Sequence, residues 1–448
     1  MKKNDFLTLK IEDLNNLGYG VSHINGKTVF VSGAVDGDTV ECKIIKDCGS
    51  YFIARTERLI DSSEHRIAPL CPVCSQCGGC AYAQISYDHE REIKKGTVAG
   101  AFRKVGLPDV HIAGVCNDGN TEYYRNKAII PIGYSDKLGF FSGFYAPKTH
   151  RIIPADSCLL HKPIFTEITE LARKTMADNK ALFLTKKGLP VIKSLYFRGA
   201  ENNDTELTLV LEEESREAVR ILCEAVTHDF DCVKTVLTNL NPGDISTVLS
   251  HDYKLIYGEG HIYDELCGAK LKITPASFYQ VNRNMAELLY KKGAELLCLE
   301  ENETVCDLYC GIGSIGLSVF RDHKLTGIEV VESAVECAKE NAKLNGCEAD
   351  YYCGDAGEVI ERMNLTFDAV VLDPPRKGCT PELINYLCEK KKIKKILYIS
   401  CNPATLARDA KQMLALGYEM GTVYPYDLFP RTGHVESVVC LTRSDKAT

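Results

Sequence analysis

The C-terminal part of the chain alternates strand-like and helix-like segments, and this pattern restricts the fold more than any other feature. From about residue 275 onward, short apolar runs are separated by segments with helical periodicity. Five of these runs are candidate buried strands: TVCDLYCG, KLTGIEV, ADYYCGD, FDAVVLDPP and KKILYIS. Strands that alternate with helices predict a parallel, doubly wound α/β sheet. We therefore expect a Rossmann-like C-terminal domain.

The segments before residue 275 predict two further units. Residues 1–58 contain four or five short alternating runs between glycine turns, which is typical of a small β-barrel of the OB type. Such a barrel binds RNA or serves only as a lid, and we favour RNA binding. Residues from about 110 to 265 mix short strands and helices, which indicates an α+β region. We predict domains at residues 1–60, 61–270 and 271–448.

Composition limits the environment of the protein. The chain has 448 residues, of which 45% are hydrophobic and 25% charged, as is ordinary for a globular protein. No signal peptide follows the initial MKK, and no apolar segment approaches the ~20 residues that span a bilayer. We expect a cytoplasmic protein without a membrane partner, whose 21 cysteines are thiols or metal ligands. The net charge of −8 argues weakly against a nucleic-acid partner, and a local basic groove would answer that objection. Nothing suggests a coiled coil, so we expect a monomer.

The first strand of the predicted C-terminal sheet leads into a glycine-rich turn. Asp307 lies at the end of this strand, and Gly311, Gly313 and Gly316 follow it. Glycines let the backbone approach a nucleotide closely, and Glu329 at the end of the next strand is suited to hold ribose hydroxyls. This pattern fits a dinucleotide dehydrogenase as well as an S-adenosylmethionine enzyme.

Two later strand ends carry chemically interesting residues. Asp373 follows the fourth strand in DPPRKG, and Arg376 stands where methyltransferases of adenine or glutamine amino groups carry an aromatic residue. Cys401 follows the fifth strand in SCNP and precedes a helix, whose N-terminus is expected to lower the pKa of the thiol. A buried cysteine is otherwise a small apolar core residue. Because Asp373 and Cys401 lie at the same predicted sheet edge, we favour a catalytic role.

Together these motifs resemble the RNA uracil-5-methyltransferase family. The resemblance covers the whole chain, including a TRAM-like barrel and a cysteine cluster, and rests on FYQVN (278–282), DLYCGIGSIGLS (307–318), DPPRKG (373–378), SCNP (400–403) and HVESVV (434–439). It implies a class I methyltransferase domain in which Cys401 is the nucleophile and Glu436 the base. It also implies S-adenosylmethionine contacts from Gln280, Tyr309, Glu329 and Asp373.

Several positions near these motifs have a simpler alternative. Phe278 is a candidate for stacking on the target base. Tyr309 taken alone would pack under the glycine turn, and Gln280 would cap a helix. Ser314 stands where relatives often carry Asn, so we leave it unassigned. Asp355 ends the third strand, where adenine contacts often lie in this fold, and an ordinary loop acid is the alternative.

The chemistry of uracil explains why these residue types are needed. C5 is a poor nucleophile toward a methyl sulfonium until a cysteine thiolate adds at C6 and makes C5 enolate-like. A base must then remove the C5 proton before the cysteine can leave. A uracil within folded RNA would also have to be turned out of its stack to reach Cys401.

The segment CPVCSQCGGC, residues 71–80, places four cysteines at regular spacing. By spacing alone it could hold zinc, although structural zinc sites usually separate the two cysteine pairs by a longer loop. A ferredoxin-type run has the same short spacing and takes one ligand from far away. Radical S-adenosylmethionine chemistry is rejected, because Gly313 stands where a third cysteine would follow Cys306 and Cys310.

The family resemblance is more definite about this cluster. It implies a [4Fe–4S] site formed by Cys71, Cys77, Cys80 and the distant Cys158, with Cys74 as a neighbour or substitute ligand. Methyl transfer to uracil has no net redox step, so we expect the cluster to be structural or RNA-contacting. Redox sensing is the competing idea.

The expected substrate follows from the two additions to the catalytic domain. Relatives with both a TRAM-like barrel and a cysteine cluster resemble the bacterial 23S rRNA group, so we expect 23S rRNA, with tRNA as the alternative. A non-catalytic iron–sulfur RNA-binding protein on a decayed fold is a second hypothesis, which the intact Cys401, Glu436 and Gln280 oppose. A nicotinamide-dependent oxidoreductase is a third, which leaves DPPRKG and SCNP unexplained.

Overall fold

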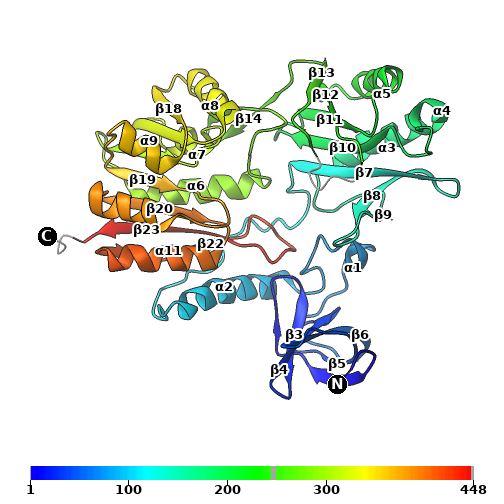
Figure 1. Ribbon diagram of the computed structural model, residues 1–448, viewed down its shortest axis with the longest axis horizontal. Helices are drawn as coiled ribbons and strands as arrows, with labels where there is room; N and C mark the ends of the chain where they lie inside the picture. Colours follow the sequence, from blue (N-terminus) through cyan, green and yellow to red (C-terminus); the bar gives the residue numbers. More distant parts are fainter. Residues whose placement is uncertain (1, 244–248, 445–448) are drawn as a thin grey trace.

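The N-terminal sheet curls around a small apolar core. The computed structural model describes residues 2–243 and 249–444, and Figure 1 shows this sheet at one end of the molecule. Its strands are hydrogen-bonded in the order β1-β5-β6-β4-β3-β2, with one strand more than the pattern predicts because β2 is too short to alternate. They span Phe6–Lys10 (β1), Asp13–Leu14 (β2), Tyr19–Ile24 (β3), Lys27–Ser32 (β4), Thr39–Asp47 (β5) and Tyr51–Asp61 (β6). The buried residues include Leu9, Val29, Val31, Val40, Ile44 and Phe52.

Two helices follow the first sheet. A single turn, α1 (Cys74–Cys77), lies inside the cysteine cluster. The long helix α2 (Tyr87–Lys104) follows the cluster, and the Ser86 hydroxyl caps its N-terminus by accepting a hydrogen bond from the His89 amide. α2 packs against helix α11 (Pro403–Ala415) of the C-terminal domain (Figure 1). The segment after the cysteines therefore contacts a part of the chain about 300 residues away in sequence.

The central part of the chain forms a mixed sheet with helices on one face. Its order is β13-β12-β11-β10-β7-β8-β9, in which β11 and β12 run parallel. The strands are Lys127–Ser135 (β7), Gly139–Tyr145 (β8), Ile152–Pro154 (β9), Ile192–Gly199 (β10), Thr205–Leu211 (β11), Val233–Leu240 (β12) and Tyr253–Tyr257 (β13). The helices are Pro163–Asp178 (α3), Lys180–Phe183 (α4) and Arg216–Asp229 (α5), and their apolar faces bury one side of the sheet.

The C-terminal part forms the doubly wound sheet that the sequence predicts. A hairpin, Ile262–Leu266 (β14) and Ala269–Ile273 (β15), and helix α6 (Arg283–Leu297) precede it. The five predicted strands are confirmed as parallel neighbours: Thr304–Leu308 (β16), Lys324–Glu329 (β17), Ala349–Cys353 (β18), Ala369–Leu372 (β19) and Lys395–Ser400 (β20). Antiparallel β23 (Glu436–Arg443) extends this sheet and pairs with Tyr418–Met420 (β21) and Tyr424–Tyr426 (β22).

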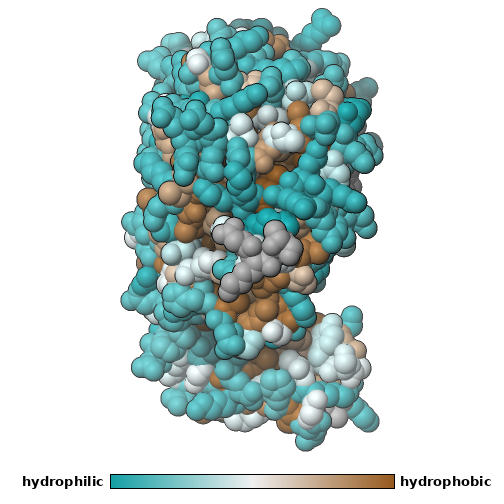
Figure 2. All heavy atoms as spheres, turned by 90° about the vertical axis from the view of Figure 1, so that its left-hand side faces the viewer, coloured by the Kyte–Doolittle hydropathy of each residue, from teal (hydrophilic) through white to brown (hydrophobic). Residues whose placement is uncertain are grey.

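Helices cover both faces of this sheet. They are Ser314–Val319 (α7), Glu332–Leu344 (α8), Ala356–Arg362 (α9), Pro381–Asn385 (α10), which continues into a π-helical turn at Tyr386–Lys390, and Pro403–Ala415 (α11). Two large apolar clusters fill the space between sheet and helices. The surface at this end of the molecule is mainly hydrophilic, with smaller hydrophobic areas between the polar ones (Figure 2). No helix within residues 2–243 and 249–444 is long and apolar enough to cross a membrane.

A buried lysine joins α2 to the loop that leads into β23. Nζ of Lys94 donates hydrogen bonds to Oε1 of Glu90 and Oδ1 of Asp427, each at 2.7 Å, and all three side chains are almost completely buried. The same Glu90 oxygen accepts a bond from the Arg431 amide at 2.8 Å. The loop formed by residues 427–435, which we call the β23 loop, is thereby fixed to a distant helix.

We predict that Lys94→Met lowers the free energy of unfolding by ~3–5 kcal/mol, because two buried carboxyl groups lose their cation. Lys95→Met is the matched control, since Lys95 lies next to it on α2 and forms no ion pair with any described residue. Urea unfolding of both variants measures the difference. Equal unfolding free energies would show that the buried lysine does not hold the loop.

Candidate active site

Asp373, Cys401 and Glu436 meet at one edge of the C-terminal sheet. β19 and β20 run parallel, so the residues that follow them, Asp373 and Cys401, lie at the same edge. β23 runs antiparallel to β20 and pairs Ser437 with Ser400, which places Glu436 beside Cys401. The charges of both carboxyl groups reach the Cys401 thiol. One thiol and two carboxyl groups are thus side by side at this edge.

Burial makes both of these carboxyl groups weak acids. Glu436 is only 5% exposed, and burial, together with the charge of Asp373, raises its pKa to about 8. Burial also raises the pKa of Asp373 to about 7. A general base is most effective when its pKa lies near the working pH. Glu436 is therefore suited to accept a proton near neutral pH.

The thiol of Cys401 differs from the expectation drawn from the sequence. Burial, with the charges of Glu436 and Asp373, raises the pKa of Cys401 to about 11. The expected lowering by the following helix is therefore wrong. α11 does begin here, with Asn402 as its N-cap, and its end lies next to the thiol in the chain. Carboxyl groups from neighbouring strands and the loss of water outweigh the helix end.

The loop after β19 brings a positive charge to this edge. The charge of Arg376 favours the ionised forms of both Cys401 and Glu436. The Arg376 carbonyl accepts a hydrogen bond from Nδ2 of Asn402 at 3.0 Å, which ties the loop to the start of α11. From the sequence, Arg376 served only to exclude another class of methyltransferase, and its effect on the pKa values of Cys401 and Glu436 was missed. The sequence did contain a signal for this effect, because Arg376 lies only three residues after Asp373.

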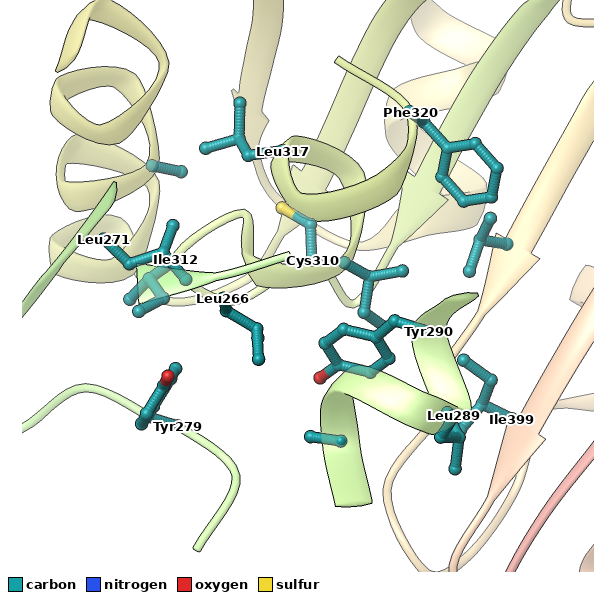
Figure 3. Packing of buried hydrophobic residues seen from close by; sticks show 14 of the residues in the cluster. Leu266, Leu271, Tyr279, Leu289, Tyr290, Cys310, Ile312, Leu317, Phe320 and Ile399 are labelled. Carbon is teal, nitrogen blue, oxygen red and sulfur yellow. The ribbon is translucent and has the colours of Figure 1, made fainter. Parts of the chain in front are cut away.

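The glycine turn after β16 is tightly packed. Gly313 has a φ of 80°, and a Cβ there would lie 2.7 Å from the Tyr351 hydroxyl oxygen, so the turn requires glycine. Tyr309 also has a positive φ, 65°, which is uncommon for a tyrosine. Its side chain packs against the second of the two apolar clusters. Figure 3 shows Cys310 and Ile312 of the turn among the buried side chains of the first cluster.

Three acidic residues surround this turn. Oδ2 of Asp307 accepts a hydrogen bond from the Gly316 amide at 3.0 Å, whereas Oδ1 is buried and has no partner among the described residues. Glu329 accepts a bond from the Gly311 amide at 3.1 Å. Burial, with the charges of Asp373 and Glu329, raises the pKa of Asp307 to about 7. Carboxyl groups gathered here suit a cationic sulfonium cofactor and oppose the pyrophosphate of a dinucleotide. The residues present thus fit S-adenosylmethionine.

The segment between β15 and α6 carries the two remaining predicted residues. Phe278 is 64% exposed and available for stacking on a base. Gln280 is 8% exposed; burial raises the pKa of Tyr290, and the side chains of Ser314 and Gln280 near its hydroxyl lower it. Gln280 does not cap α6, because Asn282 does. Tyr290 lies deep in the core (Figure 3). It was missed because the periodicity of its segment shows only that this face of the helix is buried, and not which polar groups it meets.

Asp355 acts as a helix cap. Its Oδ1 accepts hydrogen bonds from the amides of Gly357, at 2.9 Å, and Glu358, at 3.3 Å, at the start of α9. This carboxylate is engaged by backbone, as the alternative of an ordinary loop acid expects.

The clustered cysteines and Cys158 come together. Cys71, Cys80 and Cys158 line one small cavity, into which Arg431 of the β23 loop also projects. Burial, with the neighbouring thiols, raises the pKa of Cys80 to about 12. Among the described residues, no three His, Cys, Asp or Glu side chains are arranged around a single metal ion. Four thiols are also the type of donor set that a [4Fe–4S] cluster requires, and in such a cluster each ligand binds a separate iron.

Three segments of the chain match known families. Residues 2–55 match the TRAM domain, residues 289–384 the methyltransferase small domain, and residues 357–444 the tRNA (Uracil-5-)-methyltransferase family. The structure is similar to that of the Pyrococcus abyssi tRNA (uracil-54, C5)-methyltransferase in complex with S-adenosyl-L-homocysteine. The TM-score is 0.78 at 24% sequence identity, and the similarity covers 97% of this chain and 99% of that one.

Relatives of known sequence extend the similarity over the full length. The chain is 35% identical to an uncharacterized RNA methyltransferase of Bacillus cereus (strain ATCC 10987 / NRS 248), covering 100% of this chain and 98% of the relative. It is 33% identical to an uncharacterized RNA methyltransferase of Clostridium tetani (strain Massachusetts / E88), covering 99% and 97%. The doubly wound sheet with its glycine turn, together with the match to the methyltransferase small domain, identifies a class I methyltransferase domain. The chain belongs to the S-adenosylmethionine-dependent RNA uracil-5-methyltransferase family, with an N-terminal TRAM domain. The fold, family and enzyme class expected from the sequence are confirmed.

The raised pKa of Glu436 predicts a pH-dependent cost in stability. Its pKa rises from 4.5 to about 8 on folding. Between these pH values the native state retains a proton that the unfolded chain releases, so stability falls as the pH rises through this window. We expect Glu436→Gln to raise the free energy of unfolding by ~1–3 kcal/mol at about pH 9, with little gain at about pH 5.

Urea unfolding at both pH values tests this expectation. The control is Glu265→Gln, an exposed glutamate on β14, which should leave the unfolding free energy unchanged at either pH. A gain of equal size at both pH values would contradict a raised pKa for Glu436.

Proposed function

We propose that this protein methylates C5 of a uridine in RNA through a covalent cysteine adduct. The observation that carries the proposal is the position of Cys401 beside Glu436 at the sheet edge, with Asp373 next to both. S-Adenosylmethionine, when bound, supplies the methyl group, and Gln280, Tyr309, Glu329 and Asp373 are the residues proposed to hold it.

The chain's own residues account for the remaining steps. Sγ of Cys401 forms a bond to uracil C6 while its proton passes to a neighbouring carboxylate, and C5 becomes nucleophilic. After C5 has taken the methyl group, Glu436 removes the C5 proton, the C6–S bond breaks and the C5=C6 double bond is restored. Phe278 stacks on the extruded base. Arg376 favours the thiolate form of Cys401 at the start and at the end of this sequence.

We propose 23S rRNA as the substrate. The support is that the chain combines a TRAM domain with a cysteine cluster, the two additions that mark the 23S rRNA group by resemblance. tRNA is the second candidate, because the Pyrococcus abyssi enzyme of similar structure acts on tRNA uracil-54. The protein is proposed to act as a monomer, with residues 1–60 binding RNA, 61–270 carrying the cluster and 271–448 catalysing methyl transfer.

We propose that a [4Fe–4S] cluster is held by Cys71, Cys77, Cys80 and Cys158 in a structural role. Arg431 supports this role, because it lies in the β23 loop and lines the same cavity as three of these cysteines. A cluster there would brace the loop that leads into Glu436. Cys74 is the remaining thiol of the segment and a possible replacement ligand.

We expect labelled S-adenosylmethionine to methylate an unmodified 23S rRNA domain and not an unmodified tRNA transcript, and Cys401→Ala to reduce the rate at least ~10³-fold. Cys353→Ala, at an exposed cysteine of the same sheet, is the control that keeps full activity. Label in tRNA alone would retain the chemistry and overturn the substrate. If neither the unsubstituted protein nor Cys353→Ala transfers label to either RNA, the catalytic proposal would be wrong.

We expect protein purified without oxygen to contain about four irons per chain. Cys158→Ser should lose most of this iron, and Cys74→Ser should retain it. Iron and sulfide analysis with the visible absorption spectrum provides the measurement. Equal losses in the two variants would make Cys74 a ligand, and an iron-free unsubstituted protein would contradict the cluster.

A further inference from the structure

The segment before α6 is held by the central sheet rather than by the catalytic one. The Tyr196 hydroxyl of β10 donates a hydrogen bond to the Pro275 carbonyl at 3.1 Å. Nη2 of Arg198, on the same strand, donates to the Ser277 carbonyl, and its Nε donates to the Tyr196 hydroxyl at 2.9 Å. Ser277 directly precedes Phe278, and Pro275 lies three residues before it. One strand of the central domain therefore fixes the backbone that enters the site.

The guanidinium of Arg198 is buried with a single carboxyl group opposite it. Arg198 is 4% exposed and Tyr196 is 3% exposed. In the β10–β11 register, Arg198 pairs with Glu206, which is completely buried and whose two oxygens have no hydrogen-bond partner among the described residues. Burial raises the pKa of Glu206 to about 8, and the charge of Arg198 opposes this rise, so the two groups interact electrostatically without a hydrogen bond. The hydrogen bonds of Arg198 go instead to the oxygens of Tyr196 and Ser277, and its planar guanidinium donates them in fixed directions.

The side chains around Phe278 explain why the backbone must be fixed. Tyr279, the next residue, points into the core (Figure 3), and its hydroxyl donates to Oδ2 of Asp264 at 2.9 Å. Phe278 itself is 64% exposed, so packing contributes little to its position. On the far side, Nδ2 of Asn126 donates to the Gln280 carbonyl at 2.9 Å. Hydrogen bonds to the backbone on both sides of Phe278 therefore fix the segment that carries the exposed ring.

We propose that Arg198, acting with Tyr196, is a positioning residue for methyl transfer: it fixes the backbone that presents Phe278 to the target base. The inference rests on the proposed function and adds to it a residue from outside the catalytic sheet. Gln280 has its own anchor, so the cofactor side of the same segment is held separately. Loss of the Arg198 guanidinium should therefore slow the reaction of Cys401 with the target base of the RNA and leave cofactor binding unchanged.

RNA that carries 5-fluorouridine at the target isolates this step. Fluorine replaces the proton that the base removes, so the methylated Cys401 adduct persists and its formation can be timed at saturating RNA. We expect Arg198→Lys, which keeps the charge and loses the fork, to slow adduct formation about 10- to 100-fold. Tyr196→Phe should slow it about 10-fold, and the affinity for S-adenosylhomocysteine should change less than about twofold.

Two further variants distinguish loss of the proposed positioning from general destabilisation of the protein. The pair Arg198→Met with Glu206→Leu removes the fork without leaving a lone buried charge and should show the same defect as Arg198→Lys. Ser194→Ala, on the same face of β10, should behave as the unsubstituted protein. Unchanged adduct rates in the Arg198 variants, or a parallel loss of S-adenosylhomocysteine binding, would overturn the inference. No adduct with the unsubstituted protein would overturn the proposed function and the inference with it.

Discussion

A buried ammonium group joins parts of the chain that are far apart in sequence. Lys94 is 1% exposed and bonds to Asp427, which lies 333 residues further along. A charge in this position is costly unless it is paired and hydrogen-bonded, so Lys94, Glu90 and Asp427 are stable only as a set. They fix the β23 loop, and the strand that follows this loop begins with Glu436. The position of Glu436, the proposed base, therefore depends on a helix that follows the cysteine cluster.

The β23 loop also explains how a metal cluster could serve a reaction without a redox step. Its Arg431 lines the cavity of the cysteines, and its Pro430 carbonyl accepts a hydrogen bond from the Tyr124 hydroxyl at 3.0 Å. Gly433 approaches the Asn16 carbonyl of the N-terminal sheet so closely that no side chain would fit. The barrel, the cysteine segment and α2 thus all support one loop. A cluster in this cavity would act on catalysis by keeping Glu436 in place.

Sequence patterns predicted the catalytic fold well and the environment of its residues only in part. Alternating runs identified all five parallel strands, and strand ends correctly placed Asp373 and Cys401 at one edge. Periodicity shows which face of an element is buried and not which distant element covers it, so Lys94 and Arg198 carried no signal. The pKa of Cys401 was predicted wrongly because the following helix is local, whereas the carboxyl of Glu436 arrives on a strand that pairs from far along the chain.

The roles proposed for Glu436 and Cys401 require opposite effects from the same surroundings. Burial raises the pKa of Glu436 toward neutrality, which makes it a better base, and raises that of Cys401, which makes the thiol harder to ionise. Asp373 adds to both shifts, and Arg376 opposes both. The loop that carries Arg376 therefore adjusts the pKa values of Cys401 and Glu436 together. Its hydrogen bond to Asn402, the residue after Cys401, holds the loop and its positive charge beside both groups.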